Sequence, residues 1–102
     1  MIEQRLEKQL ITIGLRVDKV EKIILFGSRA VGDHKKRSDI DLAFVAPDMA
    51  RREWIDLTFT IEDELDTLLL LDIVKLEDED VSLQFKKEII KNGKVLYSKL
   101  ED

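Results

Sequence analysis

The sequence of 102 residues contains no cysteine, a single proline and a single histidine. Without cysteine, the chain has neither a disulfide framework nor a thiolate zinc site. No apolar run approaches the roughly 20 residues that span a bilayer, and the N-terminus lacks the pattern of a secretory signal peptide. These absences favour a cytoplasmic protein that makes no use of a membrane.

The chain also lacks an excess of positive charge, since its formal net charge is -5. Sequence-independent binding to duplex nucleic acid needs many contacts from Lys and Arg to phosphates, so the acidic balance argues against nucleic acid as a partner. The charge is unevenly distributed. A basic run, Lys35-Lys36-Arg37, precedes an acidic run at 77–80, and the basic run has the right sign to meet the phosphates of a nucleotide.

Composition and periodicity predict one α/β (α+β) domain over residues 1–102. Hydrophobic residues make up 44% and charged residues 38%, which suits a folded protein, and no repeat or linker interrupts the chain. The apolar spacing predicts a small mixed β-sheet packed with helices. We expect helices at 2–15, 49–65 and 81–91, one helical turn at 28–31, and strands at 20–26, 39–45, 68–76 and 95–97. Asp48 and Asp80 are the expected N-caps of the second and third long helices, and Gly93 is expected to end the last helix.

Two aspartates, Asp39 and Asp41, alternate along the strand expected at 39–45. Alternate residues of a strand share a face, so these carboxylates point the same way and repel each other unless a cation lies between them. Mg²⁺ prefers carboxylate oxygens together with substrate phosphates. The competing interpretation is a solvated sheet edge, because a lone Asp-x-Asp is common.

A third carboxylate, Asp72, lies in the apolar run Leu68–Val74. An uncompensated charge buried in such a run costs several kcal/mol, which favours a use for it. If its strand lies beside the strand of Asp41, Asp72 completes a cluster of three carboxylates. The alternatives are that Asp72 meets water at a strand end, or that it pairs with a cation such as Arg29.

The pair Gly27-Ser28 follows a predicted strand. A glycine there lets the backbone turn sharply and approach a ligand closely. Ser28 offers a hydroxyl and a backbone N–H to a phosphate at the start of a helical turn. An ordinary strand-to-helix turn would use the same two residues. His34, in a charged loop, is interpreted as solvated rather than catalytic.

In combination these motifs resemble the nucleotidyltransferase fold of the DNA polymerase β superfamily. The resemblance rests on Leu25–Ala30, on the ten residues between Ser28 and Asp39, and on Ser38–Leu42. The short length and Leu71–Val74 are similar to the minimal nucleotidyltransferase (MNT) branch. The resemblance implies that Asp39, Asp41 and Asp72 are the catalytic and metal-binding residues. It also implies that Gly27 and Ser28 bind the phosphates of ATP, and that Mg²⁺ is the metal.

The MNT resemblance further implies a partner, since proteins of this branch typically pair with a small helical HEPN-family protein. In such toxin–antitoxin pairs the MNT antitoxin transfers AMP to a tyrosine of the toxin, which predicts a hetero-oligomer. Two other functions stay open: a binding module that neutralises the toxin by contact alone, and a transferase acting on a small molecule or an RNA end. The helix bearing Trp54, Leu57 and Phe59 is an expected interface, although core packing explains those residues equally well.

No residue pattern assigns the base of the nucleotide, so ATP follows from the resemblance alone. Nor does any residue pattern indicate which acceptor is used, how many AMP units are transferred, or whether the chain is active without a partner.

Overall fold

The computed structural model describes residues 2–35 and 37–99. Within them the chain forms four helices and four strands, in the order α1 (Gln4–Arg16), β1 (Lys22–Phe26), α2 (Ser28–Val31), β2 (Ile40–Val45), α3 (Arg51–Glu64), β3 (Leu71–Lys75), α4 (Leu83–Asn92) and β4 (Lys94–Ser98). The element types and their order agree with the prediction.

The strands form one mixed sheet in the order β3-β2-β1-β4. Strand β1 runs antiparallel to both β2 and β4, whereas β2 and β3 run parallel. The parallel pair needs a crossover connection, and helix α3 provides it between β2 and β3. The predicted α/β class with a small mixed sheet is confirmed.

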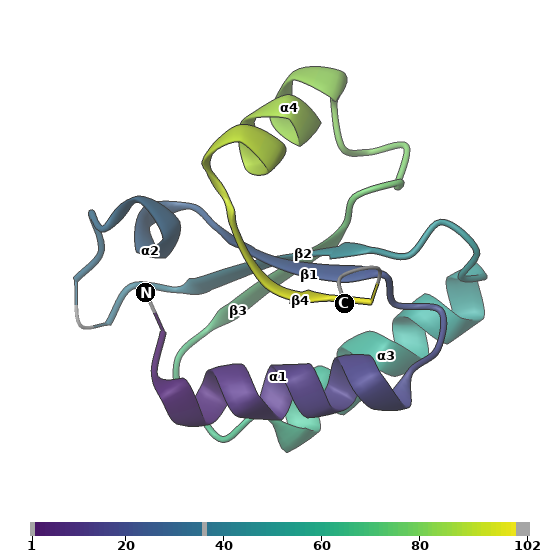
Figure 1. The fold of residues 1–102 in the computed structure, drawn as a ribbon, viewed down its shortest axis with the longest axis horizontal. Helices are drawn as coiled ribbons and strands as arrows, with labels where there is room; N and C mark the ends of the chain where they lie inside the picture. The colour runs from purple at the N-terminus through teal and green to yellow at the C-terminus, as the bar shows by residue number, and fades with distance from the viewer. Residues whose placement is uncertain (1, 36, 100–102) are drawn as a thin grey trace.

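Both faces of the sheet are covered by helices, as Figure 1 shows, with α1 and α3 on one side and α4 on the other. Under α1 and α3 lie strand residues that are fully buried: Ile23, Leu25, Ile40, Leu42 and Phe44. Burial of each such side chain contributes about 1.5–3 kcal/mol. The α4 side holds a smaller apolar cluster of Ile24, Phe26, Ala43, Leu76 and Ile89.

Strand alternation decides which face carries the acidic residues. Asp41 has the same parity as Ala43 on β2, and Asp72 has the same parity as Val74 on β3. Ala43 and Val74 both pack in the α4-side cluster, so the two carboxylates lie on that face as well. Each is the second residue of its strand, so both lie near the starts of β2 and β3.

The prediction of Asp48 as the cap of α3 is wrong. The N-cap is Ala50, whose backbone N–H donates to Oε1 of Glu53 at 2.9 Å. A glutamate three residues into the helix thereby satisfies an N–H that the helix itself leaves free.

The prediction of Asp80 as the cap of α4 is also wrong. The helix begins at Leu83, and Oγ of its N-cap Ser82 accepts the N–H of Phe85 at 3.1 Å. Asp80 lies in the preceding turn, where its N–H donates to Oδ1 of Asp78 at 3.2 Å.

The apolar run before β3 is mostly outside the core. The strand begins at Leu71 rather than at Leu68. Leu68 is fully exposed and Leu70 is 72% exposed. Neighbouring leucines in this run therefore do not make a buried strand.

The predicted apolar face of α3 packs against the sheet. Leu57 and Ile61 are buried, and the Trp54 ring meets Phe44 edge-on with centroids 5.8 Å apart. Phe59 points away from the core and is 69% exposed. No helix in the described part of the chain combines the length and apolar character that a membrane crossing needs.

Candidate active site

Three predicted site residues converge at the starts of the two parallel strands. Asp41 on β2 and Asp72 on β3 are partners in the register of the parallel pair. Asp39 lies one residue before β2 and two before Asp41. The interpretation of Asp72 as adjacent to the Asp39-x-Asp41 pair agrees with this placement. Asp72 is also exposed, so its carboxylate meets water at the beginning of the strand.

The carboxylates influence one another electrically. The pKa of Asp41 is raised, first because the group is partly buried, and then by the negative charges of Asp72 and Asp39. Arg29 opposes this shift. Partial burial and like charges both disfavour the ionised form. The cluster is therefore a place where a bound cation would relieve repulsion.

The backbone of Gly27 lies close against the Asp41 side chain. Its φ of +74° lies in a region that L residues rarely adopt, and a β-carbon at this position would overlap Oδ2 of Asp41. Glycine is required here for two independent reasons, the backbone conformation and the close approach. The turn that ends β1 thus lies directly against Asp41. The cluster of Asp39, Asp41 and Asp72 is called the carboxylate corner below.

Ser28 begins α2 and is half-buried. The carbonyl of Gly27 accepts the N–H of Ala30 at 3.1 Å, which forms the first turn of this four-residue helix. The predicted helical turn at 28–31 is confirmed. Ser28 thus directly follows Gly27, the residue that contacts the Asp41 carboxylate, and lies on the same turn.

Arg29 joins the two halves of the site, a role that the sequence did not reveal. Its side chain is only 7% exposed, and Nε and Nη2 donate to the carbonyl of Ser38 at 3.1 and 2.9 Å. Ser38 immediately precedes Asp39. The buried guanidinium therefore fixes the segment that leads into the carboxylates relative to the Gly27-Ser28 turn.

The loop between these two segments carries the predicted basic run. Lys35 and Arg37 are exposed, and Lys36 lies outside the described residues. The N–H of Lys35 donates to Oγ of Ser38 at 2.8 Å, which closes a tight turn before Asp39. His34 is partly buried rather than solvated, and burial lowers its pKa.

The donor set at this corner fits a hard divalent cation. In the part of the chain that the structure describes, no three acidic or histidine side chains form a ready-made metal cage. Mg²⁺ rarely requires one, because it is usually held by one or two carboxylates together with waters and substrate phosphates. The open corner of Asp39, Asp41 and Asp72, which the backbone of Gly27 approaches closely, suits that mode of binding.

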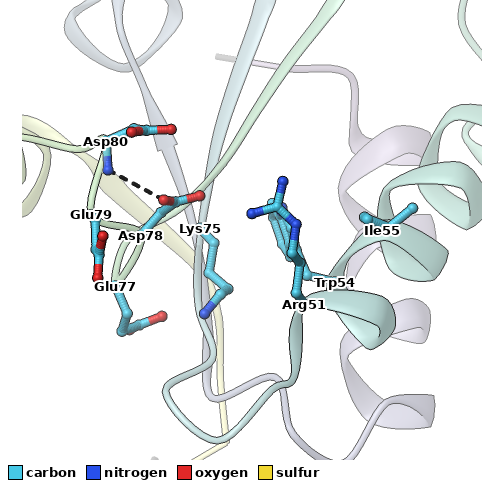
Figure 2. A pocket seen from close by; sticks show the side chains of 8 residues that line it. All are labelled: Arg51, Trp54, Ile55, Lys75, Glu77, Asp78, Glu79 and Asp80. Atoms are coloured by element: carbon cyan, nitrogen blue, oxygen red, sulfur yellow. Dashed lines mark hydrogen bonds between the residues drawn. The ribbon is translucent and has the colours of Figure 1, made fainter.

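Several hollows lie on the described surface. One of about 420 Å³ is lined by Asp39 together with Arg37 and Leu68–Leu70. A larger one, about 550 Å³, lies between the start of α3 and the loop after β3, away from the carboxylate corner. Figure 2 shows Arg51, Trp54 and Ile55 facing Lys75 and the acidic run Glu77–Asp80 across this hollow. None of the predicted site residues lines it.

A smaller hollow, about 270 Å³, begins at Gly27 itself. It lies between α2 and α4 and is lined by Phe26, Gly27, Val31, Phe85, Glu88, Ile89, Asn92 and Gly93. No sequence motif pointed to this hollow, because α2 and α4 are far apart in the chain.

Comparison with known proteins assigns the family. The description "Polymerase beta, Nucleotidyltransferase" matches residues 8–102. The chain belongs to this nucleotidyltransferase family. The two motifs that carried the resemblance, and the whole sheet, lie within the matched region.

Two relatives of this nucleotidyltransferase come from Methanocaldococcus jannaschii, and both are named as candidate protein adenylyltransferases. MJ1547 is 33% identical over 81 residues, which are 79% of this chain and 58% of that protein. MJ0604 is 34% identical over 89 residues, which are 78% of this chain and 80% of that protein. The chain therefore spans somewhat more than half of the first relative and most of the second.

The solved structures to which the nucleotidyltransferase is similar include toxin–antitoxin complexes. A toxin–antitoxin complex with AMP-PNP matches with a TM-score of 0.71 at 27% identity, covering 92% of this chain and 74% of the other. A Shewanella oneidensis MNT antitoxin, in complex with its tri-AMPylated HEPN toxin, matches with a TM-score of 0.68 at 25% identity, covering 95% and 73%. The MNT-type fold is thereby confirmed.

Proposed function

We propose that this chain is a metal-dependent nucleotidyltransferase that transfers AMP from ATP to a tyrosine hydroxyl of a HEPN-family partner, and that it acts as the antitoxin of that pair. One observation carries the proposal. Asp41 and Asp72 are paired in register on the α4 side of the sheet, and Gly27 leaves no room for a side chain against Asp41. The relatives' names and the AMPylated toxin bound to a similar antitoxin give the acceptor class.

In this proposal Asp39 and Asp41 hold Mg²⁺ together with phosphate oxygens, and Asp72 completes the set. When bound, the metal supplies positive charge for the attacking and leaving oxygens of an in-line displacement. The pKa of Asp41 is raised first by burial and then by its acidic neighbours, and a bound cation would relieve the repulsion from those neighbours.

The remaining residues bind and orient the substrates. The backbone and hydroxyl at Gly27 and Ser28 hold the phosphates, and exposed Lys35 and Arg37 lie in the loop that would face the departing pyrophosphate. Asp72 takes the proton of the acceptor hydroxyl. A bond forms from that oxygen to the α-phosphorus as the bond to the bridging oxygen of pyrophosphate breaks. Catalysis of this kind comes mainly from positioning and charge neutralisation.

Intact-mass spectrometry of the partner tests the proposal. The purified chain is incubated with a HEPN-family partner, ATP and Mg²⁺, and the partner is expected to gain one or more AMP groups, mapped to tyrosine by peptide sequencing. Asp39→Asn/Asp41→Asn is expected to abolish the gain. Asp56→Asn/Asp63→Asn, which removes two exposed carboxylates from α3, is the matched control and is expected to leave it intact.

A contact-only antitoxin remains the second candidate, and exposed apolar side chains favour it. Leu68, Leu70 and Phe59 are 104%, 72% and 69% exposed, and such residues are typical of protein interfaces when they gather in a patch. Full neutralisation of the toxin by the Asp39→Asn/Asp41→Asn variant, without any AMP on the toxin, would support this candidate and refute the enzyme. Transfer to a small molecule or an RNA end predicts instead that a labelled adenylyl group appears on those acceptors and not on the partner.

A further inference from the structure

The groove between α2 and α4 has the composition of a ligand pocket rather than of a solvated surface. Its walls are the apolar side chains of Phe26, Val31, Phe85 and Ile89, and its volume is about 270 Å³. Val31 is 61% exposed and Phe85 is 39% exposed, so this apolar surface faces water. Small-molecule sites combine such apolar walls with a few polar groups that fix orientation.

The two aromatic rings in the groove are held against each other. Phe26 and Phe85 meet edge to face with centroids 5.6 Å apart and an interplanar angle of 82°. Phe26 is buried in the sheet, so it anchors the more exposed Phe85 ring. Aromatic walls fixed in this way favour a flat, polarisable ligand.

Two polar side chains, Glu88 and Asn92, line the groove among the described residues. Nδ2 of Asn92 donates to Oε1 of Glu88 at 2.6 Å, and both residues are exposed near the end of α4. This hydrogen bond leaves Oδ1 of Asn92 and the second carboxylate oxygen of Glu88 as further acceptors. A ligand that donates from an amino group on its edge would meet them.

Among the described residues that line the groove, Glu88 is the sole charged one, so they offer no positive charge to hold phosphate. The groove nevertheless adjoins the carboxylate corner, because Gly27 lines the groove and contacts Asp41. A nucleotide with its α-phosphate at the carboxylates would thus be able to extend its base into the groove while its phosphates avoid Glu88.

We propose that this groove is the base subsite of the nucleotidyltransferase, and that it takes the adenine ring of ATP. The inference rests on the proposed function. Phe85 and Val31 pack against the ring, and Glu88 and Asn92 accept from its exocyclic amino group. The sequence motifs hold the phosphates and the metal, and the α2–α4 groove adds the recognition of the base.

Binding measurements separate the base from the phosphates. A non-hydrolysable ATP analogue and inorganic tripolyphosphate are each titrated, with Mg²⁺, into the chain and into its complex with the HEPN partner. Phe85→Ala is expected to weaken binding of the ATP analogue by roughly fivefold or more and to leave tripolyphosphate binding unchanged. Val31→Ser, at an exposed position, is expected to weaken it less and in the same direction.

Ile90→Ala is the matched control, because Ile90 is 65% exposed on the same helix but lies outside the groove. It is expected to change neither affinity. Thermal unfolding verifies that each variant is folded. If Phe85→Ala does not fold, the affinity of Val31→Ser for the ATP analogue tests the base subsite instead.

The outcomes are distinct. If wild type binds both probes and the groove variants bind the analogue normally, the base subsite is refuted and the proposed function stands. If wild type binds neither probe in either state, the nucleotide site itself is refuted and the base subsite with it. If Val31→Ser weakens binding of the HEPN partner but not binding of the ATP analogue, the groove is a protein contact and the inference is wrong.

The polar side chains Glu88 and Asn92 make a separate prediction within the same experiment. An inosine analogue carries a carbonyl where adenine carries the amino group, so it presents an acceptor to Glu88 and Asn92. We expect it to bind roughly fivefold or more weakly than the adenosine analogue, and we expect Glu88→Ala/Asn92→Ala to narrow that gap. Equal binding of the two analogues by wild type would refute the assignment of these two side chains.

Discussion

Asp41 and Asp72 lie directly opposite each other in the register of the parallel strands β2 and β3. The two carboxylates are remote in sequence, and the crossover through α3 brings them together. Their proximity is visible in the raised pKa of Asp41, to which the charge of Asp72 contributes after burial. This coupling can be measured without any substrate.

Removal of the charge at residue 72 is expected to lower the pKa of Asp41. In Asp72→Asn the repulsion from one neighbour is gone, so the ionised form of Asp41 becomes easier to reach. Burial and Asp39 remain, so the pKa should return only part of the way to its usual range. Carboxyl-carbon NMR titration of Asp41 measures the change. Asp63→Asn on α3 is the control and should leave the titration of Asp41 unaltered; an unaltered titration in Asp72→Asn would contradict the coupling.

Neutralising Asp41 is expected to stabilise the fold. Because the folded-state pKa of Asp41 lies above its unfolded value, the folded chain binds more protons between the two values, and stability falls as pH rises through that window. Above it the destabilisation is complete, so Asp41→Asn should unfold at a higher temperature than wild type at pH 7 without metal. Below the unfolded pKa of the carboxylate the two proteins should converge. Thermal unfolding across pH 3–8 tests this, and an Asp41→Asn protein that unfolds at a lower temperature at pH 7 would refute it.

Gly27 and Gly32 form a natural pair for testing the close approach to Asp41. Both have positive φ, at 74° and 80°, but a β-carbon on Gly32 meets nothing within 4 Å. Gly32→Ala should therefore lose only the backbone term of about 1–2 kcal/mol, with little effect on nucleotide binding. Gly27→Ala should lose more stability and should also displace the Asp41 side chain, which weakens metal-dependent nucleotide binding. Chemical denaturation and calorimetric titration compare them, and equal losses in both variants would show that the contact with Asp41 has no consequence.

The sequence predicted well what is encoded locally. The strands, the turn at Gly27 and the helical turn after it follow from apolar spacing and punctuation by glycine. The shared face of Asp39 and Asp41 stays a prediction, because β2 begins at Ile40 and Asp39 precedes it. The adjacency of Asp72 depended on β3 lying beside β2, which the structure shows. The apolar run before Asp72 is a poor guide to the cost of its charge, because Leu68 and Leu70 are exposed rather than buried.

Features that depend on tertiary contacts were missed. The α2–α4 groove joins residues about sixty positions apart, which no local pattern records. The sequence offered Arg29 as a possible partner of Asp72. Its burial depends on the fold, which brings the carbonyl of Ser38 within hydrogen-bond distance of its guanidinium.

The buried position of Arg29 predicts a structural loss on substitution. Arg29→Met removes a charged donor pair to the Ser38 carbonyl and is expected to cost about 1.5–3 kcal/mol of unfolding free energy. It should also loosen the segment that leads into Asp39 and so weaken nucleotide binding. Arg52→Met is the control, because Arg52 is exposed on α3, and it should change neither property. Urea denaturation gives the free energies; a fully stable Arg29→Met protein would contradict the role of this guanidinium.

Helix capping offers the clearest contrast between sequence pattern and structure. Both Asp80 and Ser82 are residue types that favour an N-cap, and Asp80 was the predicted cap. In the structure Ser82 caps α4, and its hydroxyl accepts the N–H of Phe85. Ser82→Ala is therefore expected to lower the free energy of unfolding by about 1 kcal/mol, whereas Asp80→Ala should change it by less than half of that. Because α4 carries Phe85, the Ser82 variant should also loosen the α2–α4 groove, detectable as faster amide hydrogen exchange in the first turn of α4. Equal destabilisation by the two variants would mean that the helix begins earlier than at Leu83.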